Sequence, residues 1–284
     1  MDEIPEYHLH RDDLSKLHFE INETEPYCDK NTLHCFKPHR HSFYQIIWFK
    51  EEGRHYIDYE ILNHPRNSIV LINKNQVHHF CPDSKNEGVI FHFNDIFLTQ
   101  YDFKFSYILF SGIGSNFFSL NTNQIDRIDT LLTIIQQELA EKKTYFQIQL
   151  FLIFHSFILL LEQLKNKSKS GSKHINDPLF YIAVKFKAEI GLHLSESKSL
   201  TFYFDKLNVN SKKLTLASKK YLNDTPNNII RKEKLIESKR LLLNSDLSIQ
   251  QIAYSLGYDQ PTYFTKIFKG HFNTTPKEFR ESVF

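Results

Sequence analysis

The sequence predicts an α+β protein, in which a strand-rich amino-terminal half precedes an all-helical carboxyl-terminal half. Residues 39 to about 93 consist of short β-branched and aromatic runs between turn residues, a pattern typical of a small barrel or sandwich. Past about residue 123 the apolar residues recur at helical spacing instead. Charge divides in a similar way, because residues 1–171 carry about −5 and the remainder about +7, within a net charge of only +2.

Length and composition limit the classes of protein to which this chain can belong. A chain of 284 residues exceeds the roughly 100 to 200 residues of one domain, so two modules are expected. A hydrophobic content of 41% with 26 Phe and 14 Tyr supports real cores and excludes a disordered chain. An acidic half joined to a basic half favours a sensor linked to a nucleic-acid-binding module over one uniform enzyme body.

Cysteine usage and the apolar runs predict a reduced, cytoplasmic protein that does not enter a membrane. Three cysteines without a CxxC spacing favour free thiols over a disulfide framework or a zinc site. The most apolar run, residues 151–161, is too short to span a bilayer, and the first 20 residues lack the apolar region of a signal peptide. We expect no cofactor and no resident metal.

The first module is expected over residues 1–122. Residues 1 to about 37 are predicted to form loops and short strands, because prolines interrupt any long element. Turn residues such as Gly53 then separate the β-rich runs. The predicted strands are residues 43–50, 55–62, 68–73 and 88–93.

Two long helices are predicted next, over residues 123–164. The first carries an apolar stripe that includes Ile128, Leu132 and Ile135, and the second is apolar nearly all round. The second helix must therefore be buried, either inside its own domain or against a second subunit, and the adjacent stripe favours a homodimer formed by this segment. Residues 165–177, rich in Ser and Lys, are predicted to be a flexible linker.

Residues 178–284 are predicted to form an all-helical module. Thr225 and Thr275 each precede a Pro at the first position of a helix, and Ser248 with Gln251 forms a capping box. The expected helices lie near residues 178–191, 200–207, 211–222, 226–243, 249–256, 261–271 and 276–283.

Residues 249–271 fit a helix-turn-helix unit. The small Ala253 lets the second helix approach the first, and Gly257 can take the left-handed turn conformation at no steric cost. The second helix buries Phe264 and Phe268, which leaves hydroxyls and amines on its outer face. Such a face suits a DNA major groove, although an ordinary three-helix unit with a solvated face shows the same pattern. The outward residues are Thr262, Thr265, Lys266 and Lys269.

The same plan recurs about 50 residues earlier in the chain. Residues 200–222 place Asn208 at the turn and follow it with a lysine-rich helix. The helix between the two units is long enough to act as a rigid spacer. Two recognition helices fixed in this way could enter successive major grooves on one face of double-stranded DNA.

The carboxyl-terminal residues resemble a known family. Residues 238–280 match the frame LL…S-I-x-x-I-A…L-G-Y…Y-F…F-K…F…T-P-x-E-F-R, the carboxyl-terminal signature of the AraC/XylS family of transcription regulators. The resemblance implies a DNA-binding domain over residues 178–284, with helix-turn-helix units at about 200–222 and 249–271. The residues that it implies in DNA contact are Gln260, Pro261, Thr262, Thr265 and Lys266 in the second unit and Lys212, Thr215 and Leu216 in the first. Lys213, Lys219 and Lys269, on or near the same helices, complete the predicted DNA-binding set.

The first unit departs from the family pattern at four positions. Phe204 stands where a small Ala is usual, and Leu216 stands where Arg or Lys is common. Ser218 replaces an aromatic core residue, and Asn223 replaces the Gly that ends the helix. We therefore hypothesise that the second unit carries most of the sequence specificity. The lysine-rich first unit would mainly bind phosphates, with a strong dependence on salt.

Histidines cluster in the first module, which holds eleven of the 15 within its first 92 residues. In a strand, His39, His41 and Gln45 would alternate onto one face, and His78 could join them in a small barrel. This arrangement resembles the cupin fold, where H-x-H, a carboxylate four residues on and a later His bind a metal. Gln45 replaces that carboxylate, and a neutral amide is a poor ligand for a divalent metal.

These four residues are therefore candidates for a pocket that binds a small organic effector. Two alternatives stay open for the cluster. Three imidazoles and an amide could still hold a metal, or the histidines could only satisfy hydrogen bonds of the barrel core or titrate at its surface.

The sequence as a whole predicts a cytoplasmic regulator of the AraC type with a cupin-like sensing barrel, a helical dimerisation segment and a double helix-turn-helix domain. The family resemblance adds RNA polymerase as the expected partner, and activation as the expected effect. Two rival classes remain, a cupin-type metal-dependent enzyme with a helical appendage and an interaction protein whose helix-turn-helix units bind protein. Stoichiometric metal would favour the first rival, and salt-sensitive DNA binding would contradict the second.

Overall fold

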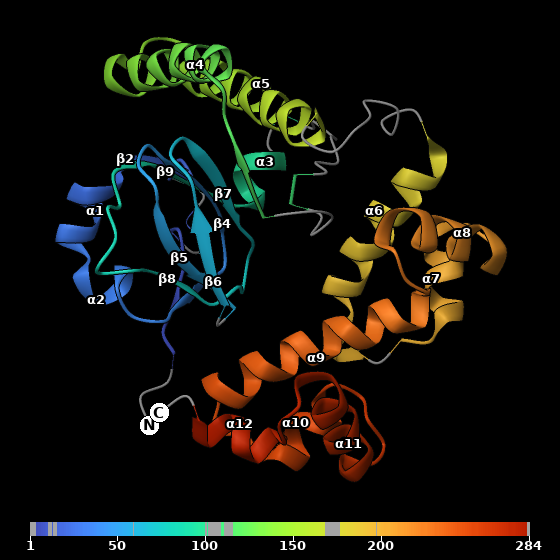
Figure 1. Cartoon of the computed structure of the whole chain (residues 1–284). Helices are drawn as coiled ribbons and strands as arrows, with labels where there is room; N and C mark the ends of the chain where they lie inside the picture. The colour runs from blue at the N-terminus through green and yellow to red at the C-terminus, as the bar shows by residue number, and fades with distance from the viewer. Residues whose placement is uncertain are drawn as a thin grey trace. The chain divides into compact units, whose positions relative to one another are not determined.

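The chain folds into two compact units, which contain residues 5–172 and 173–284 (Figure 1). The computed structural model describes residues 4–282 except 11–12, 14–15, 59, 100, 102–108, 111–115, 168–176 and 197. The predicted α+β class is confirmed, because the first unit is rich in strands and the described part of the second is helical. Most of the predicted linker lies outside the described residues, and its residues 165–167 belong to the helix that precedes it.

The first unit is built from two facing sheets and a covering pair of helices (Figure 1). Its strands are β1 (Glu6–Tyr7), β2 (Phe19–Glu23), β3 (Arg40–His41), β4 (Tyr44–Phe49), β5 (Gly53–Ile57), β6 (Glu60–His64), β7 (Ser68–Ile72), β8 (His78–Phe80), β9 (Gly88–Phe93) and β10 (Phe117–Ser119). Its helices are α1 (Thr24–Lys30), α2 (Thr32–Cys35), α3 (Asp95–Thr99), α4 (Thr122–Glu141) and α5 (Phe146–Lys167). The larger sheet has the strand order β10-β7-β4-β9-β2 and the smaller β6-β5-β8, while β1 pairs with β3.

The larger sheet is buried on both faces, which explains why β4, β7 and β9 are continuous apolar runs. One face packs against the smaller sheet through a cluster that includes Phe49 and Phe80. The other face packs against α4 and α5 through a cluster that includes Trp48, Phe91 and Phe154. Alternate residues of β4 therefore enter different cores, and Gln45 lies on the same face as Phe49.

Two predictions for the first unit are wrong. The single strand predicted at 55–62 is a hairpin, because Asp58 takes a left-handed conformation (φ 48°) and its carboxylate accepts a hydrogen bond from Val77 N at 3.3 Å. The arm predicted as loops and short strands also holds two short helices, α1 and α2. Both helices are shorter than the window over which helical periodicity can be recognised.

The apolar helix α5 is a core element of the first unit. Its residues Leu150, Phe154 and Leu161 are fully buried. By length and composition alone, Phe146–Lys165 could cross a membrane, and this apolar stretch is longer than residues 151–161. However, 56% of its apolar window is buried inside the protein. Burial within its own unit, the first of the two predicted possibilities, accounts for most of its apolar surface.

The helices of the second unit lie within one residue of their predicted bounds. They are α6 (Pro178–Leu192), α7 (Leu200–Leu207), α8 (Ser211–Leu222), α9 (Pro226–Asn244), α10 (Ile249–Ser255), α11 (Pro261–Phe272) and α12 (Pro276–Ser282), with a 3₁₀ turn at Leu194–Glu196. The predicted caps are also present. Thr225 accepts from Asn228 N at 3.4 Å, and Ser248 and Gln251 form the reciprocal capping box.

Helix α9 joins two small cores. Its first turns pack with α6, α7 and α8 through a cluster that includes Ile229 and Tyr203. Its later turns pack with α10, α11 and α12 through Leu242, Phe264 and Phe268. Figure 1 shows these two groups of helices arranged along α9. At about 1.5 Å per residue, the helix spans about 28 Å and separates the two helix-turn-helix units.

Candidate functional site

The two helix-turn-helix units, α7–α8 and α10–α11, have the same turn. In each, the backbone N–H after the turn residue donates to a carbonyl five residues back, with Val209 bonded to Phe204 at 3.0 Å and Tyr258 bonded to Ala253 at 2.9 Å. This bond needs a left-handed residue immediately before its donor. The sequence therefore encodes one turn geometry twice, at the positions where the two turns were predicted.

The left-handed residue differs between the units. It is Asn208 in the first (φ 51°) and Gly257 in the second (φ 71°). Glycine adopts this conformation without a penalty, and Asn tolerates it better than most other residues.

The outer face of α11 is the predicted recognition surface of the second unit. Phe264 and Phe268 are fully buried, and Ile267 packs against the same core. Thr265 is half-buried and its hydroxyl donates to Pro261 O at 3.0 Å. The exposed members of the predicted set are Gln260, Thr262, Lys266 and Lys269, and Pro261 is half-buried.

The outer face of α8 is richer in lysine. Leu214 and Ala217 are buried, and Thr215 is half-buried. Leu216 is 49% exposed. The exposed lysines of the predicted set are Lys212, Lys213 and Lys219. None of these three forms a salt bridge with another described residue, whereas the neighbouring Lys220 is 2.5 Å from Asp177.

Ser218 marks a difference in packing between the units. It follows Leu214 by four residues, as Phe268 follows Phe264, and it is equally buried. Its hydroxyl has no hydrogen-bond partner in the described part of the chain. A buried hydroxyl without a partner costs stability, so this position stabilises the first unit less than Phe268 stabilises the second.

Sequence reasoning missed one exposed aromatic residue beside the recognition surface. Tyr263 is 54% exposed on α11 and lies one turn before Lys266. The spacing in the sequence could have identified it, because an aromatic residue three positions before Lys266 lies next to that lysine on the helix surface.

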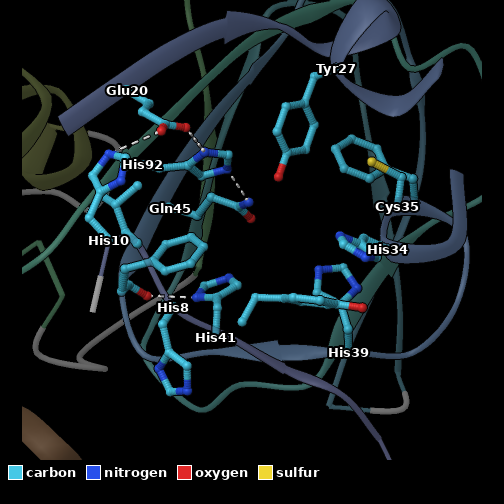
Figure 2. A pocket seen from close by; sticks show the side chains of 14 residues that line it. His8, His10, Glu20, Tyr27, His34, Cys35, His39, His41, Gln45 and His92 are labelled. Atoms are coloured by element: carbon cyan, nitrogen blue, oxygen red, sulfur yellow. Dashed lines mark hydrogen bonds and ion pairs between the residues drawn. The ribbon is translucent and has the colours of Figure 1, made fainter. Parts of the chain in front are cut away.

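A cavity of about 200 Å³ lies inside the first unit (Figure 2). Strands β2, β4 and β9 contribute Glu20, Gln45 and His92 to its lining, and α1 and α2 contribute Tyr27 and Cys35. Imidazole rings are the commonest group in the lining. The histidines that line it are His8, His10, His34, His39, His41 and His92.

Three of the four predicted effector-pocket residues line this cavity, and the fourth does not. His39, His41 and Gln45 face it, although β3 ends at His41 and β4 begins at Tyr44, so they do not share one strand. His78 is outside the lining. Its Nε2 lies 3.0 Å from His41 Nε2 and its ring lies 4.3 Å from that of His39, so it packs behind two of the lining residues.

A single carbonyl sets the tautomers of three histidines. His41 Nδ1 must donate to Phe43 O at 2.7 Å, because a carbonyl oxygen only accepts. His41 Nε2 then accepts from His78 Nε2, and His78 Nδ1 accepts from His55 Nε2 at 3.1 Å. Burial lowers the pKa of His41 to about 3 and holds the pKa values of His55 and His78 well below their usual range, so all three are neutral.

In this hydrogen-bond chain the Nε2 atoms of His41 and His78 are bonded to each other. Among the residues that the structure describes, no group of three His, Cys, Asp or Glu side chains is arranged to hold a metal ion.

A second chain of polar groups includes the predicted residue Gln45. Glu20 Oε2 lies 3.9 Å from His92 Nδ1, and Gln45 Nε2 donates to His92 Nε2 at 2.7 Å. The neighbouring His92 ring lowers the pKa of Glu20, and burial lowers the pKa of His92. Sequence reasoning missed His92, although a histidine in the otherwise apolar run 88–93 was a usable signal.

Family models match both units. An "AraC-like ligand binding domain" matches residues 25–101, and a "Helix-turn-helix domain" matches residues 203–282. The first range covers much of the cavity-bearing unit and the second covers both recognition helices. The chain belongs to the AraC/XylS family. These matches give no support to the alternative of a metal-dependent enzyme.

The relatives resemble parts of this AraC/XylS chain. The xylose operon regulatory protein of Haemophilus influenzae is 30% identical over 115 residues, which are 40% of this chain and 29% of that protein. The probable transcription factor PqrA of Proteus vulgaris is 47% identical over 53 residues, 19% of this chain and 43% of that protein. The alignments thus span less than half the length of either relative. The crystal structure of ToxT from Vibrio cholerae O395 covers 93% of this chain and 98% of its own, with 15% identity and a TM-score of 0.43.

Proposed function

We propose that this protein is a sequence-specific DNA-binding transcription regulator, whose first unit binds a small-molecule effector and whose second unit binds double-stranded DNA. The observation that carries the proposal is the repeated helix-turn-helix. Each copy presents exposed lysines on the outer face of its second helix, and α9 holds the two copies apart by a fixed length. Two helices fixed about one DNA turn apart can enter successive major grooves.

The two units would divide the work of recognition. On α11, Thr262 and Lys266 are exposed beside the half-buried Thr265, so short hydroxyls can reach base edges next to an amine. On α8, Lys212, Lys213 and Lys219 lack competing salt bridges with described residues and are suited to phosphates. Leu216 adds an apolar contact of the kind that a thymine methyl group accepts.

Genome-wide occupancy mapping of the tagged protein in its own cells tests this function. Discrete bound promoters are expected for the unchanged protein. A variant with Thr262→Ala and Lys266→Ala should lose those peaks, because it lacks the proposed base contacts. Lys277→Ala serves as the matched control, because Lys277 is exposed in the same unit but lies on α12. Equal occupancy by the double variant would contradict the assignment of the recognition face.

We further propose a homodimer formed through α4 and α5. Support comes from the apolar side chains that these helices leave uncovered, of which Ile148 is 40% and Leu152 is 55% exposed. Analytical ultracentrifugation of the full chain should give a dimer that Leu152→Asp converts to a monomer. A monomer at micromolar concentration, before any substitution, would contradict the proposal.

The remaining assignments rest on the family resemblance. We place the protein in the cytoplasm, with RNA polymerase as the partner through which it activates transcription. We assign it no catalytic activity, because the cavity and the helical faces described above are accounted for by binding.

A further inference from the structure

The cavity of the first unit presents hydrogen-bond acceptors to its interior. His39 Nδ1 donates to Lys37 O at 3.0 Å, so the neutral ring keeps Nε2 as an acceptor. Burial supports the neutral form, because it lowers the pKa of His39 to about 4. His41 offers no donor, since its two nitrogens bond to Phe43 and His78.

The orientation of the Gln45 amide follows from its neighbours. The Glu20 carboxylate lies 3.9 Å from His92 Nδ1, and its negative charge favours the tautomer of the neutral ring that carries the proton on Nδ1. His92 Nε2 must then accept, which places the NH₂ group of Gln45 against it. Gln45 Oε1 is left buried, without a partner among the described residues, beside the cavity (Figure 2). A buried acceptor of this kind is costly unless a ligand donates to it.

The charge and the aromatic rings of the lining favour the same kind of ligand as its acceptors do. Glu20 is the only carboxylate among the lining residues that the structure describes, and none of them is Lys or Arg. Its side chain is 40% exposed at the edge of the cavity. Tyr7, Tyr27 and Phe43 contribute aromatic rings, whose faces attract cations. The lining therefore offers an anionic ligand no Lys or Arg to pair with, and His10 is already 3.3 Å from the Glu20 carboxylate.

We propose that the cavity binds a small organic cation that donates hydrogen bonds, namely a primary ammonium or guanidinium compound. Its N–H groups would bond to Gln45 Oε1 and to the carboxylate of Glu20, with the rings of Tyr27 and Phe43 around it. A volume of about 200 Å³ restricts the occupant to a small molecule. The inference rests on the proposed function in one respect, that this unit is the effector sensor.

A pair of shape-matched probes tests the ligand class. Isothermal titration calorimetry with the full chain at constant ionic strength would compare ethylguanidinium with the neutral N-ethylurea, and both with propionate and D-xylose. Ethylguanidinium should bind at least about tenfold more tightly than N-ethylurea, because a charge-assisted hydrogen bond contributes more than a neutral one. Equal affinity for the two probes would overturn the proposal. Tighter binding of propionate or D-xylose than of ethylguanidinium would also overturn it.

Two variants test the residues that carry the inference. Glu20→Gln should remove most of the preference for the cation, whereas Glu23→Gln, on the exposed end of the same strand, should keep it. Gln45→Met should weaken the binding of ethylguanidinium and should not tighten the binding of N-ethylurea. An unchanged preference in Glu20→Gln would overturn the assignment.

DNA binding is measured on the same samples, so that two kinds of failure are distinguishable. Retained DNA binding without any cation binding would overturn the ligand class alone. Absence of DNA binding would contradict the proposed function itself.

Discussion

Mild acid should destabilise the first unit, because folding keeps its buried histidines neutral. The pKa is lowered by burial to about 4 in His39 and to about 3 in His41, from about 6.5 in an unfolded chain. Below pH 6.5 the unfolded state therefore binds protons at these histidines while the folded state does not, so the free energy of unfolding falls as the pH falls. At pH 5, about 1.5 pH units below the unfolded-state pKa, each of these two histidines lowers the free energy of unfolding by about 2 kcal/mol. The two together lower the free energy of unfolding by about 4 kcal/mol relative to pH 7.5, and His55 and His78 act in the same direction.

The fluorescence of Trp48 reports this unit selectively, because it is the only Trp of the sequence and is 1% exposed in the first unit. Urea titrations at pH 7.5 and pH 5 should give the predicted difference in unfolding free energy. A His41→Phe variant should be less stable at pH 7.5 but should lose about 2 kcal/mol less on acidification. Equal unfolding free energies at the two pH values would show that the buried histidines do not lose stability on acidification.

Three further predictions concern the second unit. Gly257→Ala should lower the unfolding free energy of this unit by about 1–2 kcal/mol because φ is positive at Gly257, and Gly257→Asn should lower it by less. Urea unfolding followed by circular dichroism measures both losses, and equal losses in the two variants would contradict the prediction. Phe268→Ala should cost about 3–5 kcal/mol, whereas Ser218→Ala should be neutral or stabilising because its hydroxyl has no described partner; a large loss in Ser218→Ala would show that its hydroxyl is satisfied. Replacing Lys212 and Lys213 by Ala should reduce the slope of log affinity against log salt by about 2 in fluorescence anisotropy, and an unchanged slope would remove both lysines from the phosphate contacts.

The sequence predicted the second unit almost completely because its determinants are local. Caps such as Thr225 and Ser248 and the turn residues Asn208 and Gly257 act within a few positions of the chain. Apolar spacing within a single helix then separates buried Phe264 from exposed neighbours. The candidate DNA-binding face could therefore be derived helix by helix, without knowledge of tertiary contacts.

Less of the first unit could be predicted from the sequence. Much of its cavity is lined by residues far apart in sequence, such as Glu20, Gln45 and His92, which only strand pairing brings together. His78 was expected in the pocket, but its hydrogen bond with His41 holds it behind the lining. Short elements such as α1 and α2 leave no periodic pattern from which their place could be predicted.

The central claim is that both helix-turn-helix units contact one face of a DNA duplex, with specificity carried by α11. Selection of binding sites from a random duplex library by the full chain, followed by hydroxyl-radical footprinting of the selected site, tests it most directly. We expect an enriched sequence with two protected patches about 10 base pairs apart, and loss of enrichment in the variant with Thr262→Ala and Lys266→Ala. No enrichment by the unchanged protein, or the same enriched sequence from that variant, would contradict it.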